Sequence, residues 1–396
     1  MSANTLPKRE LLSLVKQLMA IPGPSGKEEE ILAFIVEKLT RAGLAPSAMT
    51  YDDAHKKSPY GGEVGNLIVK LPGTFRAPRR MMLAHVDTVP LCVGCQPIVR
   101  GDRIVPRSSS TAVGADNRSG VGVVLSTALA ILERNLPHPP LTFAFMVQEE
   151  VGLVGARHLA VNKLGKPEMA FNFDGGTNER LIVGATGATR MQIEIDGIAA
   201  HAGAHPEDGA SALVVAAEAL ASVHQEGWHG LVQKGRKKGT SNVGILNGGS
   251  AVNVVPDHAS VRAEARSHDA AFRERIVNAY RKAFNAAAKG VRNAAKKRAS
   301  VQFSSQMDYE AFRLDKSQEC LAIAKQVLTL EGLDPDLHIS DGGLDANWLN
   351  AHGIPTVTLG GGQHNAHTVR EFLDIDEYLR ACTIGLSLAV PLDEEF

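Results

Sequence analysis

Acidic and histidine side chains follow several predicted strands of this chain, at the point where each strand ends. The segment MMLAHVD places His85 and Asp87 at such an end, and LTFAFMVQEE places Glu149 and Glu150 at another. AFNFDGG ends a third strand with Asp174. Because the carboxyl ends of parallel strands meet at one edge of a sheet, where α/β proteins bind their ligands, we expect these side chains to converge.

One further aspartate and two late histidines extend this set. GADNRSG places Asp116 directly before an apolar, small-residue-rich segment, 119–133, and GGGQHNAHTVREF contains His364 and His367. Each element has an ordinary alternative, because an aspartate before a helix is a good N-cap and one before glycines forms a turn. Their joint occurrence favours a functional site over separate coincidences.

These residue types suit a pair of metal ions. Zinc prefers histidine nitrogen and carboxylate oxygen, and a two-metal site holds its ions about 3.5–4 Å apart around a shared ligand. Asp116 could bridge the ions, with His85 and Asp174 on one ion and Glu150 with a histidine on the other. Three carboxylates and a hydroxide would balance two divalent cations, so that little net charge is buried.

The neighbours of the candidate ligands gain roles from strand geometry. Residues two apart on a strand share a face, so Asp87 can reach His85 and orient its ring. Glu149 and Glu150 point in opposite directions in an extended segment. One of them can bind an ion while the other stays free as a general base.

The elements that must position these residues show two different hydrophobic patterns. Apolar runs at 66–71, 81–86, 141–147 and 170–173, which alternate with helical segments, predict an α/β sheet covered on both faces. From about residue 187, period-two runs and helices in the order β-α-β-β-α-β predict a ferredoxin-like α+β layer. A helix at 317–331 and a strand at 355–360 again show the α/β pattern of the first part. We therefore predict a discontinuous catalytic domain, 1–186 and 313–396, interrupted by an α+β domain at 187–312.

Composition excludes several function classes. The 396 residues include 42 basic and 43 acidic side chains, so the formal net charge of −1 points to neither nucleic acid nor an anionic membrane. No apolar run is long enough to cross a bilayer. Four cysteines do not form a disulfide framework, which predicts a cytoplasmic protein. Cys92 and Cys95 form a CxxC, but without a second ligand pair we interpret them as packing residues.

Seven segments together resemble the co-catalytic zinc exopeptidases that include peptidase T, the glutamate carboxypeptidases and the aminoacylases. The segments are MMLAHVDTVP, VGADNRSG, VQEEVGLVGA, NFDGG, DGIAAHAGAHPEDGASA, NVVPDHASVRAEAR and GGGQHNAHTVREF, in order across residues 81–373. The resemblance implies a three-layer α/β catalytic domain with an inserted ferredoxin-like lid domain. Because such lids commonly dimerise, it also implies a homodimer formed through residues 187–312.

The resemblance assigns the metal site. It implies two divalent ions, preferably Zn²⁺ with Co²⁺ or Mn²⁺ as alternatives. One ion would bind His85 and Asp174, the other would bind Glu150 and His367, and Asp116 would bridge them. Glu149 would be the general base, and Asp87 would support His85. His364 has no counterpart, and a cis peptide bond is expected between Asp116 and Asn117.

Three lid residues also match. The resemblance implies that His201 stabilises the developing oxyanion, in many members from the partner subunit. It implies that Asn253 and Arg266 bind the backbone and the carboxylate of the substrate.

The resemblance also narrows the substrate. The ligand at position 174 tends to be aspartate in aminopeptidases and dipeptidases, and glutamate in carboxypeptidases and aminoacylases. Asp174 and VGADN therefore favour an aminopeptidase of the peptidase T type, which acts on short peptides such as tripeptides. The alternative is a carboxypeptidase or an N-acyl-amino-acid deacylase on the same metals. A non-catalytic binding homologue would be expected to have lost a ligand or the base, whereas all six positions are present.

Overall fold

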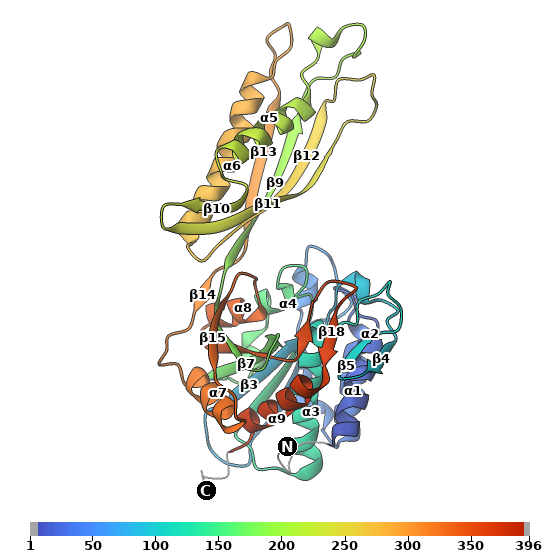
Figure 1. Cartoon of the computed structure of the whole chain (residues 1–396), viewed down its shortest axis with the longest axis vertical. Helices are drawn as coiled ribbons and strands as arrows, with labels where there is room; N and C mark the ends of the chain where they lie inside the picture. Colours follow the sequence, from blue (N-terminus) through green and yellow to red (C-terminus); the bar gives the residue numbers. More distant parts are fainter. Residues whose placement is uncertain (1–6, 392–396) are drawn as a thin grey trace. The chain divides into compact units, whose positions relative to one another are not determined.

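The computed structural model describes residues 7–391 and divides into two units. The larger unit runs up to Ala185 and resumes at Arg313, and the smaller unit is Thr186–Phe312. Figure 1 shows the elements of both units. The predicted outer limits of the catalytic domain, residues 1 and 396, lie outside the described residues.

The larger unit is built on one mixed sheet. Its strands are β1 (Met49–Tyr51), β2 (Leu67–Leu71), β3 (Arg80–His85), β6 (Leu141–Met146), β7 (Met169–Gly175), β8 (Arg180–Ala185), β14 (Phe312–Arg313), β15 (Asp336–Ser340) and β16 (Thr356–Gly360). The order is β1-β2-β6-β3-β7-β16-β8-β14, with β15 beside β8. The central strands β6, β3, β7 and β16 are parallel. The predicted α/β sheet is therefore confirmed, and its central strands end at one edge.

Helices cover both faces of this sheet. They are α1 (Lys8–Ala20), α2 (Glu29–Arg41), α3 (Ala115–Arg134), α4 (Val154–Arg157), α7 (Glu319–Leu330), α8 (Asp345–Ala351) and α9 (Ile375–Ala389). Leu349 of α8 and Ala156 of α4 pack with Ile68, Met81 and Ala144 on one face. On the other face α3 packs against β3 and β7, with α9 against α3 (Figure 1). The result is the expected three-layer unit.

Glycines allow α3 to lie close to its neighbours. A Cβ on Gly120 would lie 2.0 Å from the carbonyl oxygen of Phe173 in β7, and one on Gly122 would lie 2.6 Å from the hydroxyl of Tyr378 in α9. The helix is buried over nearly its whole length. Its N-terminus, which carries Asp116, is therefore fixed by close packing against β7.

A second, small sheet was not predicted. It has the order β17-β18-β5-β4, from β4 (Pro97–Arg100), β5 (Arg103–Pro106), β17 (Gln363–His364) and β18 (Phe372–Asp374). The motif GGGQHNAHTVREF thus contains β17, the connection that carries His367, and the first residue of β18. Strands of two or three residues are too short to show a periodic pattern.

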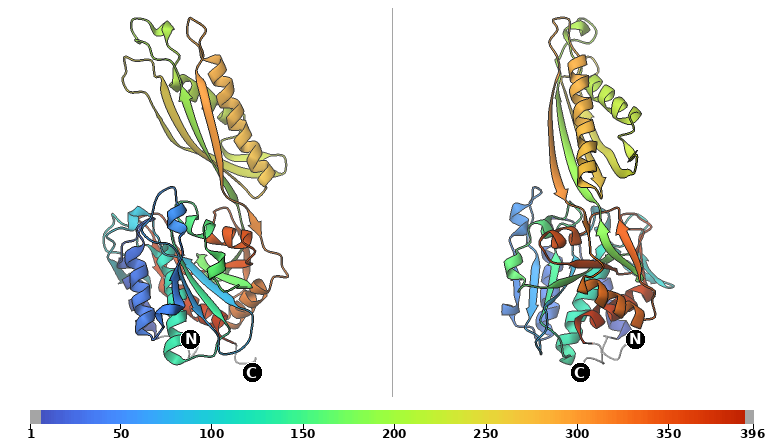
Figure 2. Two further views of the ribbon diagram at one scale, coloured as in Figure 1. Left: turned by 180° about the vertical axis from the view of Figure 1, so that it is seen from behind. Right: turned by 90° about the vertical axis from the view of Figure 1, so that its left-hand side faces the viewer.

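The smaller unit is an antiparallel sheet with two helices on one face. It contains β9 (Gly187–Asp196), α5 (Ala212–Gln225), β10 (Gly230–Lys234), β11 (Lys237–Gly248), β12 (His258–Ser267), α6 (Ala270–Gly290) and β13 (Ser300–Tyr309). The order β10-β11-β12-β9-β13 adds one strand to the predicted ferredoxin-like layer. The extra strand β10 is separated from β11 only by the turn at Gly235, so its pattern is lost among the lysines around it. Figure 2 shows α5 and α6 on the same face.

Within residues 7–391, no helix combines the length and the apolar character that crossing a bilayer requires.

The packing of α3 gives a stability prediction. Gly120→Ala should destabilise the protein by about 1–3 kcal/mol, because the new methyl group meets the backbone of β7. The measurement is the Tm from a thermal melt. Gly290→Ala is the matched control, because the nearest atom to its Cβ would be Glu218 Oε2 at 3.9 Å. Equal Tm values for Gly120→Ala and the wild type would contradict this account.

Candidate metal centre

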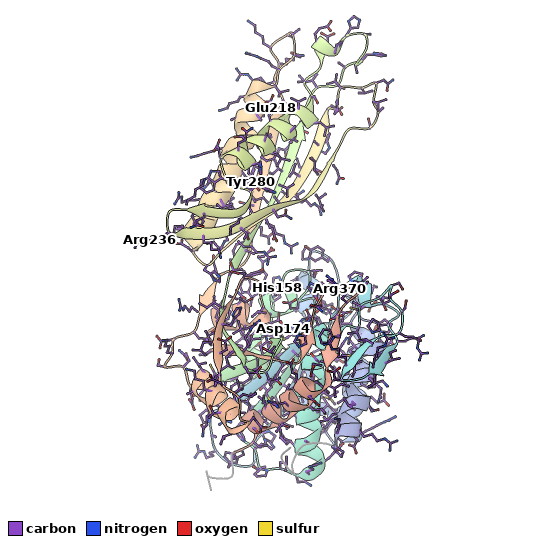
Figure 3. All side chains as sticks on the ribbon, in the orientation of Figure 1. His158, Asp174, Glu218, Arg236, Tyr280 and Arg370 are labelled. Atoms are coloured by element: carbon purple, nitrogen blue, oxygen red, sulfur yellow. The ribbon has the colours of Figure 1, made fainter. Side chains whose placement is uncertain are left out.

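Three parallel strands bring the predicted residues to one edge of the main sheet. His85 ends β3 opposite Met146 of β6, three residues before Glu149. On the other side of β3, Leu83 lies opposite Asn172 of β7, so His85 and Asp174, each two residues further on, reach the same level. Figure 3 labels Asp174 among the side chains of the larger unit. The common strand direction therefore causes the convergence.

Five side chains form two groups of potential ligands. One group is His85, Asp116 and Asp174; the other is Asp116, Glu150 and His367, and within each group the ligand atoms lie within 4.8 Å of one another. Asp116 belongs to both. Its Oδ1 lies 3.3 Å from His85 Nε2, and its Oδ2 lies 3.3 Å from His367 Nε2. A carboxylate that turns one oxygen to each group has the geometry of a bridge between two ions.

The remaining contacts complete each group. Asp174 Oδ1 lies 3.5 Å from His85 Nε2, and Glu150 Oε1 lies 2.9 Å from His367 Nε2. His364 belongs to neither group. Its Nε2 lies 2.7 Å from Glu377 Oε2, and its ring stacks on Phe372. The two histidines of the late motif thus have different surroundings.

The electrostatics of the site require positive charge. Burial alone lowers the pKa of His85, but the carboxylates of Asp174 and Glu149 outweigh it and hold the pKa well above its usual range. Hydrogen bonds with Asp116 and Glu150 raise the pKa of His367 to about 10. Two divalent cations would supply the same positive charge while leaving both imidazoles neutral as ligands. The donor set of histidine nitrogens and carboxylate oxygens therefore fits a dinuclear metal centre.

Asp116 lies at an irregular helix start. Gly114 has a left-handed conformation, with φ of 71°, and the peptide bond between Asp116 and Asn117 is cis, as predicted. The Asn117 side chain donates a 2.7 Å hydrogen bond to the carbonyl of Phe173 and accepts one from the backbone N–H of Gly120. The start of α3 is thus joined directly to the strand that carries Asp174.

Asp87 holds two parts of the centre together. Its Oδ1 lies 3.4 Å from His85 Nδ1. The same side chain accepts hydrogen bonds from the backbone N–H groups of Glu149 and Glu150, at 2.9 and 3.1 Å, and from the hydroxyl of Ser25 at 2.6 Å. One buried carboxylate therefore orients a candidate ligand and fixes the backbone of the glutamate pair.

Glu149 lies beside the ligand groups but is a member of neither. Burial raises the pKa of its carboxyl group well above the usual range, and the negative charges of Asp174, Asp345 and Glu150 act in the same direction against the opposing effect of His85. Of the two neighbouring glutamates, one is thus a potential ligand and the other an acid–base candidate.

The lid candidates lie in the smaller unit at two separate places. His201 forms an isolated bridge with Val254, and the carbonyl of Asn253 accepts a hydrogen bond from Ala202, so His201 and Asn253 belong to one corner. Arg266 lies near the far end of β12, eight residues after its first residue. Its guanidinium forms a two-pronged pair with the carboxylate of Glu264, with both contacts at 3.0 Å.

Sequence reasoning gave no role to three buried residues at the centre. Glu371 accepts hydrogen bonds from the backbone N–H groups of Gly114 and Asp116, at 2.7 and 2.9 Å. The side-chain amide of Gln363 lies against Asp116 and Asp174. Both residues belong to the motif that supplies His367, so the acid and amide of GGGQHNAHTVREF were the available signal.

The third such residue, Asp345, begins α8. It is 1% exposed, and neither carboxylate oxygen has a hydrogen-bond partner within residues 7–391. Burial raises the pKa of this carboxyl group to about 8. An aspartate at the start of a helix resembles an ordinary N-cap in the sequence, and only the three-dimensional structure shows its burial beside the centre.

The CxxC pair is buried and not joined in a disulfide. Burial raises the pKa of Cys92 to about 12 and that of Cys95 to about 11. Thiols with so high a pKa form little of the thiolate that metal binding and redox chemistry require, which fits the packing interpretation.

Comparisons with known proteins agree with this architecture. Residues 66–224 match Peptidase family M28, and residues 183–292 match a peptidase dimerisation domain. The structure of a tripeptidase from Staphylococcus aureus subsp. aureus is similar, with a TM-score of 0.85 and 28% identity over 97% of this chain and 98% of that one. Aminopeptidase PepT from Bacillus cereus gives a TM-score of 0.80 and 29% identity, with coverage of 97% and 98%.

One relative is named as a different type of peptidase. A probable carboxypeptidase from Uncinocarpus reesii is 30% identical over 283 residues, which cover 65% of this chain and 61% of that protein.

Fold, ligand groups and matches together define a class, the metal-dependent peptide hydrolases. Within this class, the chain resembles the exopeptidases of the peptidase T type. The family resemblance read from the seven sequence segments is confirmed.

The two late histidines give a paired prediction. His367→Ala should remove one of two bound ions and nearly abolish hydrolysis, because a three-residue ligand group loses its only imidazole. His364→Ala should retain both ions, since its side chain contacts Glu377 instead. Metal content by elemental analysis, with peptide hydrolysis measured in parallel, tests both. Loss of an ion from His364→Ala would be the contrary result.

Glu371 gives a second prediction. Glu371→Ala should weaken metal binding about 10- to 100-fold, as is typical when a group that orients a ligand is lost. The physical reason is that the N–H groups of Gly114 and Asp116 lose their acceptor. Calorimetric titration of the chelator-treated protein with Zn²⁺ measures this affinity. Arg370→Ala, an exposed neighbour, is the control and should titrate like the wild type.

Proposed function

We propose that this protein is a dinuclear aminopeptidase that releases the N-terminal residue of short peptides, with tripeptides as the preferred length. The observation that carries the proposal is the pair of ligand groups that share Asp116, with Glu149 beside them but outside both. Aspartate at position 174 and the likeness to a tripeptidase and to an aminopeptidase support this choice of substrate.

The centre would hold two divalent ions, with Zn²⁺ preferred over Co²⁺ or Mn²⁺. In this proposal His85 and Asp174 hold the first ion, Glu150 and His367 hold the second, and Asp116 holds both. When bound, such ions polarise the scissile carbonyl and lower the pKa of water toward neutrality. The side chains described above perform the remaining steps.

Glu149 would act as the general base. It takes a proton from the attacking water and later gives it to the leaving amine. Burial raises the pKa of its carboxyl group well above the usual range, and the charge of His85 opposes that rise. Asp87 contacts Nδ1 of His85, and this contact turns Nε2 of the ring toward Asp116 and Asp174.

His201 would donate a hydrogen bond to the oxyanion of the tetrahedral intermediate. The backbone N–H groups of Gly203 and Ala204 point at its Nδ1, at 3.2 and 3.1 Å. Nδ1 therefore acts as an acceptor, and Nε2 is the nitrogen that can donate to an oxyanion.

Asn253 and Arg266 would bind the substrate backbone and carboxylate. Arg266 would have to exchange the carboxylate of Glu264 for that of the substrate. The match to a peptidase dimerisation domain supports a homodimer formed through the smaller unit, in which His201 serves the partner's centre. The four unpaired cysteines support a reducing, cytoplasmic location.

A carboxypeptidase or an N-acyl-amino-acid deacylase is the second candidate, supported by the likeness to a probable carboxypeptidase. The same centre and the same base would serve either reaction. The candidates differ in which end of the substrate must be free.

A substrate panel separates these candidates. The zinc-loaded enzyme should cleave a free tripeptide and, with a higher KM because Arg266 would lose its carboxylate partner, the C-amidated form. It should cleave neither the N-acetylated tripeptide nor an N-acyl amino acid. The reason is that an aminopeptidase requires a free amino end. Product analysis by mass spectrometry is the measurement. Loss of cleavage on amidation would favour a carboxypeptidase, and rapid hydrolysis of the acyl amino acid a deacylase.

The adjacent glutamates provide a matched test of their proposed roles, general base for Glu149 and metal ligand for Glu150. Glu149→Gln should lower kcat about 10²- to 10⁴-fold while two ions remain bound, because the general base is lost but no ligand is. Glu150→Gln should instead weaken the binding of one ion. Unchanged kcat in Glu149→Gln would contradict the role of Glu149, and a wild-type protein that binds no metal and hydrolyses no peptide would favour a non-catalytic binding homologue.

A further inference from the structure

Gln363 occupies a buried position between the two carboxylates of the first ligand group. It begins β17, pairs with Leu373 of β18, and is 7% exposed. The absence of a side chain at Gly361 leaves room for it, because a Cβ there would lie 3.1 Å from Gln363 Oε1 and 2.7 Å from Ser119 Oγ. A polar side chain buried this deeply requires partners.

The partners are the ligand oxygens themselves. Gln363 Nε2 lies 3.3 Å from Asp116 Oδ1 and 3.4 Å from Asp174 Oδ1. These are the two oxygens that face His85 Nε2. An amide nitrogen carries two hydrogens, so it can donate one to each carboxylate.

Ser119 fixes the orientation of this amide. Its hydroxyl lies 2.8 Å from Gln363 Oε1 and 2.9 Å from the carbonyl oxygen of Ala115, so its single hydrogen is shared between these two acceptors. Ser119 lies on α3, three residues after Asp116. The carbonyl end of the amide therefore has a donor on one side, and the nitrogen end is directed at the two carboxylates. The reversed amide would place a third oxygen against two negatively charged ones.

The residue type suits this position. Two buried carboxylates that face each other repel, and without a donor between them they would move apart or take up protons. A lysine or arginine would hold them together, but its charge would compete with the cation for the same oxygens. A glutamine supplies donors and adds no charge.

We propose that Gln363 is a positioning residue that holds Asp116 and Asp174 at ion-binding separation before the first ion enters. This proposal rests on the proposed dinuclear centre. In the second ligand group, Asp116 Oδ2 and Glu150 Oε1 face His367, whereas the Gln363 amide is directed at the other oxygen of Asp116, Oδ1. Loss of the amide should thus affect the two ions unequally.

The test is calorimetric titration of the chelator-treated full-length protein with Zn²⁺. Gln363→Leu fills the same space without donors, and it should weaken one of the two ions about 10- to 100-fold, the usual effect of losing a group that orients a ligand. The other ion should keep its affinity within about threefold. Equal affinities in variant and wild type, or an equal loss for both ions, would overturn the proposal.

Two further variants extend this test, one as a second probe of the amide and one as a control. Ser119→Ala leaves the amide in place but unoriented, so it should produce a smaller loss for the same ion, and it remains informative where Gln363→Leu does not fold. A loss confined to the other ion would overturn the proposal. His364→Ala, the next residue along β17, is the control and should bind both ions as the wild type does.

A merely structural role predicts a different result. A structural role would lower the Tm of Gln363→Leu by the same amount with and without zinc. A positioning role predicts that the Tm difference between variant and wild type is larger with zinc than without it. A wild-type protein that fails to bind two ions would contradict the dinuclear centre itself. Normal binding by the wild type together with unchanged Gln363→Leu would contradict only the role of Gln363.

Discussion

Repulsion among carboxylates at the carboxyl edge of the main sheet is the constraint on which the larger unit depends. Asp116, Asp174, Glu149 and Glu150 are brought into one small, largely buried space, where like charges are costly. The protein offsets this cost in three ways. Two imidazoles face the acids, backbone N–H groups are directed at the outer carboxylates Asp87 and Glu371, and the amide of Gln363 lies between two ligands.

The same constraint explains why the supporting residues come from distant parts of the chain. The backbone at these acids is held by groups from different elements: that of Asp116 by Glu371, between β17 and β18, and that of the glutamate pair by Asp87, just after β3. The parallel strands alone would bring the acids together without controlling their separation. Precise spacing is therefore a property of the connections between the elements as much as of the sheet.

Much of this could be predicted from the sequence, because strand ends are visible as apolar runs that stop at a polar residue. That pattern brought His85, Glu150 and Asp174 to one edge, and the family resemblance distinguished His367 from His364. The resemblance and the change of periodicity also predicted the α/β sheet and the inserted α+β layer. These features depend on local patterns or on whole motifs.

The features that the sequence did not reveal depend on contacts between distant residues. β17, β18 and β10 are too short or too charged to show a period, and each forms only because a partner strand is present. The side chains of Glu371 and Gln363 are hydrogen-bonded to residues more than 150 positions away in the sequence. The carboxylate of Asp345 is buried without a hydrogen-bond partner in the described chain. In each case the neighbours in sequence give no indication of these surroundings.

The position of His367 has a consequence for biosynthesis. The second ligand group combines residues 116, 150 and 367, so it needs a residue that leaves the ribosome 217 residues after Glu150. The first group is complete by residue 174, but its amide donor is residue 363. Because chains fold from the N-terminus as they are made, a nascent chain would have a folded sheet before it had a working centre. With the proposed ligand set, a peptide hydrolase built in this order would stay inert until His367 has left the ribosome.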